Sequence, residues 1–533
     1  MEYSAIENSY FKIGNKHKGL LGWLTSTDHK RIGLMYMYAI ISFFFIGGIL
    51  GGVMRTELAR PGQDFLSAQT YNAVFTVHGV IMIFLVVIPG LAAVFGNLFM
   101  PIMIGARDVS FPKLNLFSFY IYMLGAVLAV ISLFIGKGAP DTGWTFYAPY
   151  STQSGTNVIA AVLAAFVLGF SSILTGLNFI VTIHRLRAPG MTWFKMPLFP
   201  WSLYATAWIQ LLATPIVGIT LLMLVAERLF KIGFFDPNLG GDPILFQHLF
   251  WIYSHPAVYV MILPAMGVIT EIIPTFAKRK VYGYKAIALS SVAIAAVGYL
   301  VWGHHMYTAG MSGTARWVFS FLTFIVAVPS AIKVFNWIST MYKGSISLEP
   351  PFYFAMAFIF NFMIGGLTGL ILGSLATNIH VHDTSFVVAH FHYIVFGGMG
   401  FAFLAALHYW FPKIYGRMYN HKMANWSCVI IFIGFTTLYF PLFIIGLQGM
   451  PRRYFDYLPQ FQTGHFISTI GAFILGLGFL LIFINLVRSA KKGKITTSNP
   501  WGGLTLEWQI PSPPTVENFE EIPVITEGPY EYK

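Results

Sequence analysis

The chain has 533 residues, of which 56% are hydrophobic and 10% charged, whereas soluble globular proteins carry about 25% charged residues. So few charges cannot cover a water-facing surface, and the high hydrophobicity also excludes a disordered chain. The net charge of +12 is spread among apolar segments, which excludes the concentrated basic face that nucleic-acid binding needs. The single cysteine, Cys428, excludes a disulfide framework and any two-cysteine metal site within this chain.

Long apolar runs separate short polar loops along most of the chain. A bilayer core about 30 Å thick needs about 20 apolar residues per helix. We therefore expect a cytoplasmic N-terminal segment over 1–30, an all-α membrane domain over 31–490 and a cytoplasmic, extended C-terminal tail over 491–533. The predicted membrane helices cover 31–55, 73–103, 114–136, 157–183, 200–226, 248–276, 285–306, 317–341, 352–378, 386–412, 425–448 and 463–487.

The basic residues predict the orientation of these twelve spans. Most of them fall in the N-terminal segment, in alternate loops and in the tail, for example Arg185, Arg187 and Lys278. Because cytoplasmic loops are enriched in Lys and Arg, both termini should be cytoplasmic. A basic N-terminus without a transit-peptide pattern favours a bacterial inner membrane.

Six histidines lie at similar depth in four of the predicted spans. They are His78, His255, His304, His305, His390 and His392. Ionisable groups at membrane depth are costly and usually functional, and imidazole is a common ligand of copper and haem iron. One such histidine could equally be a hydrogen-bonded structural residue, but six at one depth predict metal centres.

Spacing divides these histidines between two centres. At 100° per residue, His390 and His392 point about 200° apart, so they hold different cofactors on opposite faces of one helix. His304 and His305 could share a copper ion with a third ligand, for which His255 is the candidate. Tyr259 lies one helical turn from His255 on the same face, which places a phenol beside the metal.

Several motifs resemble those of the haem-copper oxidase family, specifically subunit I of the cytochrome c oxidase type. The matching strings include YNAVFTVHGVIMIF, YSHPAVYV, WGHHMYTAG, HVHDTSFVVAHFHY and PRRYFDY, and their order and spacing match along essentially the whole chain. The resemblance implies a twelve-helix bundle around two haems and a copper.

The resemblance also implies roles for the histidines. His78 and His392 would be the axial ligands of a low-spin haem, and His390 the axial ligand of a high-spin haem. His255, His304 and His305 would bind copper. Tyr259 resembles the tyrosine that is covalently linked to the copper-ligand histidine in this family.

Further residues match the groups that surround the cofactors. Arg55 resembles the arginine that hydrogen-bonds the formyl group of the low-spin haem, which favours haem a there and haem a or a related haem at the second centre. Arg452 and Arg453 resemble the pair that holds the propionates, although a solvated outer loop would also explain them. Trp144 resembles the tryptophan on the route of incoming electrons.

Two pairs of residues resemble sites for other cations. His382 and Asp383 look like the magnesium ligands of the family, with a helix-capping aspartate as the alternative. Glu57 and Asp456 lie where some relatives bind calcium or sodium.

Polar residues on the cytoplasmic side resemble two proton routes. Lys333 and Ser330 in the eighth span would lead to Tyr259, although a lysine can also extend to the membrane interface. The second route would start at Asp108, which alone would be an ordinary loop carboxylate. Its other members are Asn97, Asn115, Ser171, Ser172 and Asn178.

The chain departs from many relatives near the end of the second route. Ala257 stands where they have a glutamate two residues after the copper-ligand histidine, as in a branch that has Tyr253 and Ser254 before it. We expect the Tyr253 hydroxyl to take over the relay.

Glu271, further along the same span, is an expected accessory proton acceptor, unless it forms a helix-end salt bridge with Lys278 or Arg279.

The implied function is that of a terminal oxidase subunit that reduces dioxygen to water and pumps protons. Its implied partners are cytochrome c, membrane lipid, subunit III, small subunits and a subunit II with a dinuclear copper centre, which this chain lacks the thiols to build. A quinol-fed oxidase with the same core is the alternative. A nitric oxide reductase is disfavoured by Ala257, Tyr259 and Lys333, and a twelve-span transporter with histidine relays would contain no haem.

Overall fold

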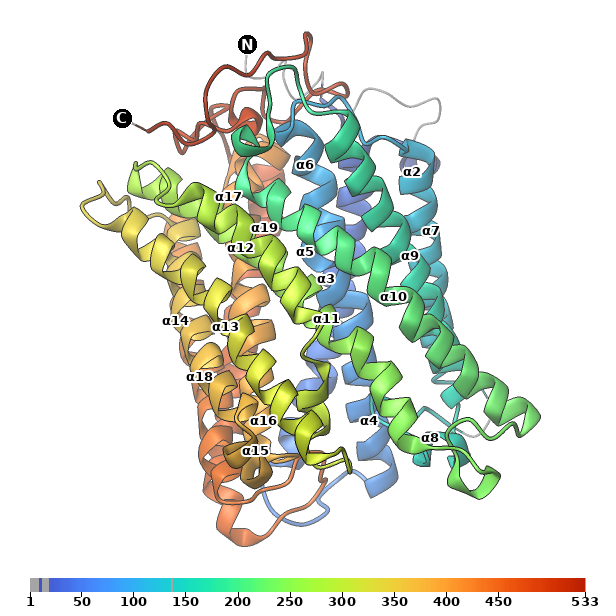
Figure 1. Ribbon diagram of the computed structural model, residues 1–533. Helices are drawn as coiled ribbons and strands as arrows, with labels where there is room; N and C mark the ends of the chain where they lie inside the picture. The colour runs from blue at the N-terminus through green and yellow to red at the C-terminus, as the bar shows by residue number, and fades with distance from the viewer. Residues whose placement is uncertain (1–8, 12–18, 136–137, 533) are drawn as a thin grey trace.

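The computed structural model describes residues 9–11, 19–135 and 138–532. Residues 1–8 and 12–18 of the predicted N-terminal segment lie outside the described residues, as does residue 136, the last of the predicted third span. Its helices run side by side along one axis as a bundle (Figure 1). The helix α2 (Gly19–Leu24) and the residues after α19 (Gln462–Lys492) lie at the same end of this bundle, and α4 (Ala68–Val80), α15 (Leu375–Val381) and α16 (Ser385–Ile394) lie at the other.

Eleven helices in the described residues are long and apolar enough to cross a membrane. Eight are single α-helices: α3 (His29–Glu57), α7 (Pro112–Ile131), α9 (Val158–Arg185), α10 (Leu198–Phe230), α11 (Pro243–Ala277), α13 (Gly313–Met341), α14 (Pro350–Gly373) and α18 (His421–Leu447). The span Pro459–Lys492 contains α19 (Gln462–Lys492) after a short 3-10 turn.

The other two spans contain π-helical turns. Ala68–Met103 consists of α4, α5 (Ile88–Leu91) and α6 (Asn97–Met103), joined by π-helices at Ile81–Val87 and Ala92–Gly96. Ser385–Tyr415 consists of α16 and α17 (Phe401–Tyr415), joined by a π-helix at Val395–Gly400. Such turns are frequent at functional sites, and both spans carry candidate haem ligands.

The predicted seventh span, 285–306, is wrong as a continuous helix. Its α-helix, α12, covers only Tyr284–Gly298, and Trp302–Met306 form a 3-10 turn. At 1.5 Å per residue, α12 is about 22 Å long, which is shorter than the hydrocarbon core. The α-helix ends where the backbone of Gly298 packs against the ring of Tyr259, and the 3-10 turn that follows carries His304 and His305.

The remaining elements are short. Three further helices are α2 (Gly19–Leu24), α8 (Tyr150–Gln153) and the α15 already placed. The strands β1 (Arg417–Met418) and β2 (Lys494–Ile495) pair antiparallel, with Arg417 opposite Ile495. Side-chain caps begin several of the long helices: Asp28 accepts from Lys30 at the start of α3, and Asp242 accepts from Ile244 at the start of α11.

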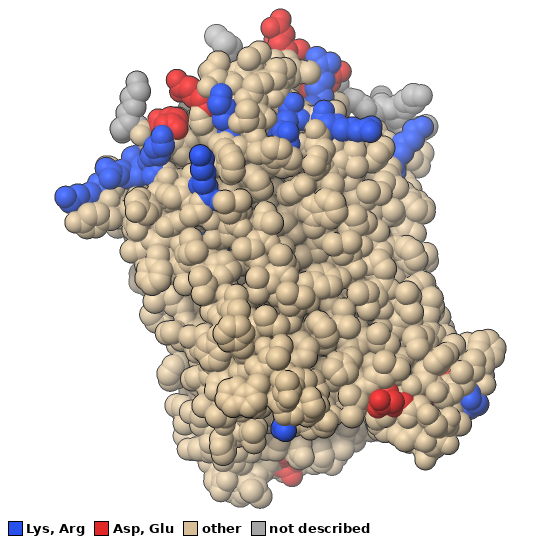
Figure 2. Space-filling view, in the orientation of Figure 1, with Lys and Arg blue, Asp and Glu red and all other residues tan. Residues whose placement is uncertain are grey.

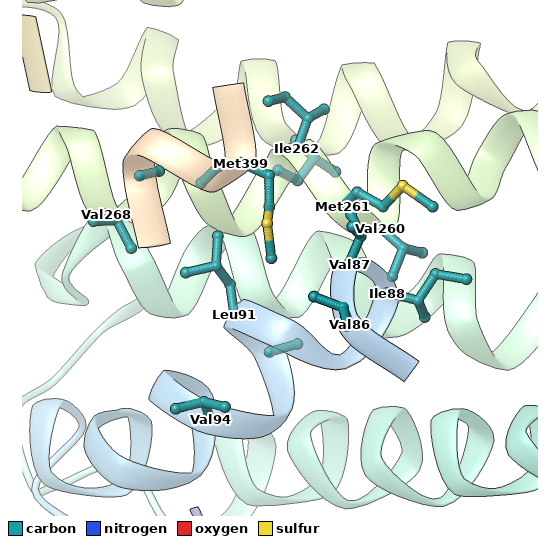
Figure 3. Close-up of a cluster of buried hydrophobic side chains, with 14 of the residues drawn as sticks. Val86, Val87, Ile88, Leu91, Val94, Val260, Met261, Ile262, Val268 and Met399 are labelled. Carbon is teal, nitrogen blue, oxygen red and sulfur yellow. The ribbon is translucent and has the colours of Figure 1, made fainter. Parts of the chain in front are cut away.

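The centre of the bundle lies between the second span and α11. Val86, Val87, Ile88, Leu91 and Val94 face Val260, Met261, Ile262, Val268 and Met399 (Figure 3). Of an apolar stretch of 18 residues in α11, 89% is buried, whereas 17% of the corresponding stretch in α3 is buried. The helix that carries His255 is therefore an interior one, whereas the most apolar part of α3 lies largely at the surface of the bundle.

The charged side chains are unevenly distributed. Lys and Arg gather at the end of the molecule where the tail after α19 lies, and few appear at the opposite end (Figure 2). By the positive-inside rule, this distribution favours a cytoplasmic location for that end. The residues after α19 cross this end with little regular structure, and the side chains of Trp508, Asn518 and Tyr530 are buried there.

Candidate functional site

Three histidines converge near the outer half of the bundle. His255 of α11 and His304 and His305 of the 3-10 turn each offer a ring nitrogen, and these nitrogens lie within 4.8 Å of one another. His255 Nδ1 and His305 Nε2 are 3.2 Å apart, and His255 Nε2 is buried without a hydrogen-bond partner. Imidazole–metal bonds of about 2.0 Å place neighbouring ligand nitrogens about 3.3 Å apart, so this geometry fits a metal ion.

Neighbouring side chains orient these rings. The ring of His305 stacks on that of Trp251, with centroids 3.7 Å apart. His304 Nδ1 lies 3.0 Å from Thr323 Oγ1, whose own hydrogen goes to the Phe319 carbonyl. His304 Nδ1 is therefore the donor, which leaves the Nε2 lone pair for a metal.

Tyr259 lies beside this cluster. Its ring centroid is 4.9 Å from that of His255. A Cβ atom at Gly298 would come within 2.5 Å of the Tyr259 ring, so only glycine allows this close approach of α12 to α11. The predicted neighbourhood of phenol and imidazole is present.

His390 and His392 of α16 have different neighbours. His390 interacts electrostatically with His304, and His392 with His78. His390 Nδ1 donates to Thr368 Oγ1 at 3.2 Å, because that hydroxyl hydrogen is directed to the Ile364 carbonyl. The structure thus separates a centre containing His390 and the histidine cluster from a centre containing His78 and His392.

The second pair also has its ring nitrogens assigned by hydrogen bonds. His78 Nδ1 donates to the Gly47 carbonyl and His392 Nδ1 to the Val388 carbonyl, each at 2.8 Å. Both Nε2 lone pairs are left for a metal. A Cβ at Gly51 of α3 would lie 3.2 Å from His78 Cε1, so glycine gives this ring its room.

Arginines and an aspartate lie on the outer side of the histidines. Arg452 forms an ion pair with Asp383, and its main-chain N–H donates to the Asp383 carbonyl at 2.9 Å. Partial burial acts to raise the pKa of Asp383, but Arg452 and His382 hold it below its ordinary value. The helix cap of α16 is Thr384, which accepts from Phe386 N–H, so the helix-capping alternative for Asp383 is wrong.

Arg453 and Trp144 connect this outer layer to the histidines. Arg453 Nη2 lies 3.5 Å from Thr145 Oγ1, next to Trp144. Trp144 packs edge-on against Trp251, with centroids 6.2 Å apart, and Trp251 is the residue on which His305 stacks. A continuous aromatic path therefore runs from Trp144 to the histidine cluster.

Arg55 and the two predicted cation-site carboxylates lie between α3 and α19. Arg55 Nη2 donates to the His465 carbonyl at 2.9 Å, and its Nε is buried without a partner. The Glu57 carboxylate is fully buried and accepts main-chain N–H bonds from residues 64–66. Asp456 Oδ1 accepts from Gly62 N–H at 2.6 Å, so both carboxylates hold the same loop.

Lys333 is buried within the bundle. Its ammonium donates to Ser291 Oγ of α12 at 2.6 Å, so it does not extend to the membrane interface. Ser330 donates instead to the Val326 carbonyl at 3.3 Å. Ser291 was not among the predicted residues, although a serine in the apolar stretch of α12 is the signal that could have identified it.

The predicted second route forms a connected set only in part. Asn115 donates to Asn97 Oδ1 at 2.8 Å, and Phe111 N–H donates to Asn178 Oδ1 at 3.0 Å. Burial, with Asp28 nearby, raises the pKa of Asp108 in its loop to about 7.

A small cavity lies further along the route. Its polar lining consists of Tyr36, Tyr122, Ser171, Ser172, Thr175 and Gln210. The Tyr36 hydroxyl lies 3.1 Å from Ser171 Oγ. Sequence reasoning missed Tyr36 and Gln210, because neither residue stands near the aspartate in the chain.

The remaining predicted residues lie on α11. Tyr253 and Ser254 are buried before His255, and Ser254 Oγ has no hydrogen-bond partner in the described residues. Glu271 is buried and accepts from Phe199 N–H at 2.8 Å and from the Tyr530 hydroxyl at 2.6 Å.

The expected salt-bridge alternative for Glu271 has no counterpart among the ion pairs of the described residues. Lys278 instead donates to the main-chain carbonyl of Trp501 at 2.5 Å.

Comparisons with known proteins agree with one another. The sequence model of the family described as cytochrome C and quinol oxidase polypeptide I matches residues 31–474. Cytochrome c oxidase subunit 1 of Thermostichus vulcanus is 46% identical over 509 residues, covering 95% of this chain and 92% of that protein. The Bacillus subtilis protein of the same name is 42% identical over 510 residues, covering 95% and 82%.

A solved structure supports the fold. The cryo-EM structure of a heme-copper terminal oxidase dimer matches with a TM-score of 0.74 at 22% identity, over 89% of this chain and 86% of that one. At this identity the match concerns the fold alone.

Proposed function

Because the chain belongs to the cytochrome c and quinol oxidase polypeptide I family, we propose that it is the catalytic subunit of a terminal respiratory oxidase that reduces dioxygen to water. The observation that carries this function is the cluster of His255, His304 and His305, with His390 beside it. The family implies haem and copper, and these cofactors supply the redox chemistry when bound.

The donor set of the chain fits these cofactors. His255, His304 and His305 would hold copper, since three neutral imidazoles suit that ion. His390 would hold the high-spin haem, and His78 with His392 the low-spin haem. This assignment is supported by their Nδ1 hydrogen bonds, which leave each Nε2 free to bind a metal.

The phenol of Tyr259 lies beside the proposed copper ligand His255. It would hold a proton there and could also supply an electron. Its link to His255 is supported by the partner-free Nε2 of that histidine and by the 4.9 Å distance between the two rings. The packing of Gly298 on Tyr259 would keep the phenol in one orientation.

Two routes would deliver protons from the cytoplasmic side. Lys333, with Ser291 and Ser330, would serve Tyr259. Asp108 would collect protons for the second route, through the asparagines, the serines and the polar cavity, toward Tyr253. Glu271 would be an accessory acceptor whose proton exchanges with the Tyr530 hydroxyl.

The surrounding polar groups would bind the periphery of the cofactors. Arg55, with its partner-free buried Nε, would donate to the formyl group of haem a, the second haem being haem a or a related one. Arg452 and Arg453 would hold propionates, and Trp144 would lie on the electron route to the haems.

Two further cation sites complete the proposal. His382 and Asp383 would bind magnesium, supported by their 3.7 Å approach. Glu57 and Asp456 would bind calcium, supported by their attachment to one outer loop. Metal analysis of the purified oxidase, before and after chelation, tests both sites.

As subunit I of such an oxidase, the chain works with a subunit II and further subunits. We assign the electron donor as cytochrome c, supported by relatives named cytochrome c oxidase subunit 1. The dinuclear copper centre would then belong to subunit II, because this chain has one cysteine, the buried Cys428. Subunit III, small subunits and lipid would complete the complex in a bacterial inner membrane. Oxygen consumption with reduced cytochrome c, compared with a quinol, tests the donor.

A visible spectrum with pyridine haemochrome analysis and copper quantification tests the core of the proposal. We expect two haems and one copper per chain in this subunit. A purified, folded complex whose subunit I contains no haem would overturn the oxidase assignment and favour a transporter.

A further inference from the structure

One side chain of the C-terminal tail joins two elements beside Asp108. Asn518 is buried, and its amide nitrogen donates to the carbonyls of Ala106 and Arg107, each at 3.0 Å, and to His29 Nε2 at 2.9 Å. Its amide oxygen accepts from Lys30 Nζ at 2.8 Å. The start of α3 and the loop that carries Asp108 are thereby fastened to each other by a residue more than 400 positions away.

The backbone at this position favours the arrangement. Asn518 has a φ of +64°, in the left-handed region that asparagine tolerates better than most residues. The two residues just before it make further contacts with the same two elements. The Val516 carbonyl accepts from Lys30 Nζ at 2.9 Å, and Arg107 pairs with Glu517 at 3.4 Å.

The same contacts extend to the interior polar set. His29 Nδ1 donates to the Asn97 carbonyl at 2.5 Å, and Asn97 Oδ1 accepts from Asn115 at 2.8 Å. Asn518 therefore contacts the loop of the second proton route directly, at Ala106 and Arg107. It is connected to Asn97 of that route indirectly, through His29.

The charged and titratable groups around Asp108 belong to four parts of the chain. Its pKa is raised to about 7 by burial, with a further contribution from Asp28, while Val109 N–H and Lys30 act in the opposite direction. The charged and titratable groups of the elements packed here are Asp28, His29 and Lys30 of α3 and its cap, Arg107 of the loop, Lys113 of α7, and Glu517, Glu520 and Glu521 of the tail.

We propose that Asn518 is a positioning residue for Asp108, which holds the proton-collecting carboxylate in its partly buried place by fastening the Ala106–Arg107 backbone to the start of α3. The proposal rests on the proposed role of Asp108 in proton uptake. Without the amide, the loop would loosen, and water would reach the carboxylate more freely.

The variant Asn518→Gly in the complete oxidase tests this role. Glycine removes the amide but adopts the same positive φ without strain. A more hydrated Asp108 has a lower pKa and loses its proton at a lower pH. We therefore expect the alkaline fall of turnover to begin about one pH unit lower than in the wild type, while turnover at pH 6 changes less than about twofold.

A matched control is Asn499→Ala. Asn499 lies in the same tail, but its amide bonds only Gly503, so the pH profile should stay that of the wild type. In an Asp108→Asn background, Asn518→Gly should cause no further shift. A shift that persists in that background would show that Asn518 acts through another group and would overturn the proposal.

The outcomes separate the two claims. An unchanged pH profile in Asn518→Gly, with proton uptake lost in Asp108→Asn, would overturn the role of Asn518 alone. Unchanged uptake in Asp108→Asn would overturn the proposed role of Asp108 itself. If Asn518→Gly yields no haem-containing protein, Asn518→Ser removes the same amide without changing any charge near Asp108, and an unshifted profile in that variant would overturn the proposal.

Discussion

The hydroxyl of Tyr253 lies on the helix turn before the space that Ala257 leaves near the histidine cluster. Replacement by phenylalanine keeps the buried ring and removes only the hydroxyl. We expect Tyr253→Phe to reduce proton pumping per electron more than Ser254→Ala does, because only the tyrosine can relay a proton across this space. Proton release from oxidase vesicles measures the ratio, and equal wild-type coupling in Tyr253→Phe would contradict the relay.

Ser291 is the hydrogen-bond acceptor of the buried Lys333 ammonium. A hydrogen bond to a charged group contributes about 1.5–3 kcal/mol, which corresponds to about tenfold or more in a rate that depends on it. Ser291→Ala should therefore slow proton delivery to Tyr259 more than Ser330→Ala does. Stopped-flow reduction of the high-spin haem measures this rate, and the reverse order of the two variants would contradict the contact.

Single residues show what sequence reasoning could and could not find. The six histidines were predicted from their depth and chemistry, which residue type and position express directly, and the structure brings His255, His304 and His305 together. Ser291, Tyr36 and Asn518 were missed, because each gains its significance from a partner on another helix or in the tail.

At the scale of elements, α12 and α11 touch at the Tyr259 ring. Gly298→Ala would place a Cβ 2.5 Å from that ring, and overpacking of this kind costs about 1–3 kcal/mol. We expect lower thermal stability together with slower oxygen reduction, because the phenol is displaced from the copper ligands. Gly366→Ala on α14 is the control, since nothing lies within 4 Å of its Cβ position.

Thermal unfolding and steady-state oxygen consumption of both variants decide this prediction. Full activity and stability in Gly298→Ala would show that the contact is not tight. Equal losses in both variants would show that the effect is a general one of alanine in these helices rather than of the Tyr259 contact.

Helix patterns predicted the elements unequally. Apolar length identified the spans, because lipid requires about 20 apolar residues whichever neighbours a helix has. The same criterion failed for 285–306, where α12 ends at Gly298 and a 3-10 turn presents the two histidines. Apolar length does not distinguish an α-helix from a tighter turn, and the π-helical turns in two other spans were equally invisible to it.

At the scale of the whole molecule, the C-terminal tail connects elements at one end of the bundle. Tyr530 donates to Glu271 from 259 positions away. Tyr530→Phe removes one of the two hydrogen bonds to that Glu271 oxygen and also the bond that the hydroxyl accepts from Leu198 N–H, so we expect a loss of about 1–3 kcal/mol of stability. Glu271→Gln keeps an acceptor oxygen and should retain stability.

Turnover separates the two interpretations of Glu271. If it exchanges protons, Glu271→Gln slows oxygen consumption although the protein remains stable. Wild-type turnover in that variant would restrict Glu271 to fastening the tail, and thermal unfolding of both variants provides the stability comparison.

The sequence by itself determined the membrane environment and the family, because hydropathy and motif spacing are properties of the chain alone. Only the tertiary structure decided which ring nitrogens remain available to a metal, which serine accepts from Lys333 and how the tail meets Asp108 and Glu271. Those are contacts of about 3 Å between residues far apart in sequence, and hydrogen bonds of that length depend on how the helices pack rather than on the order of residues along them.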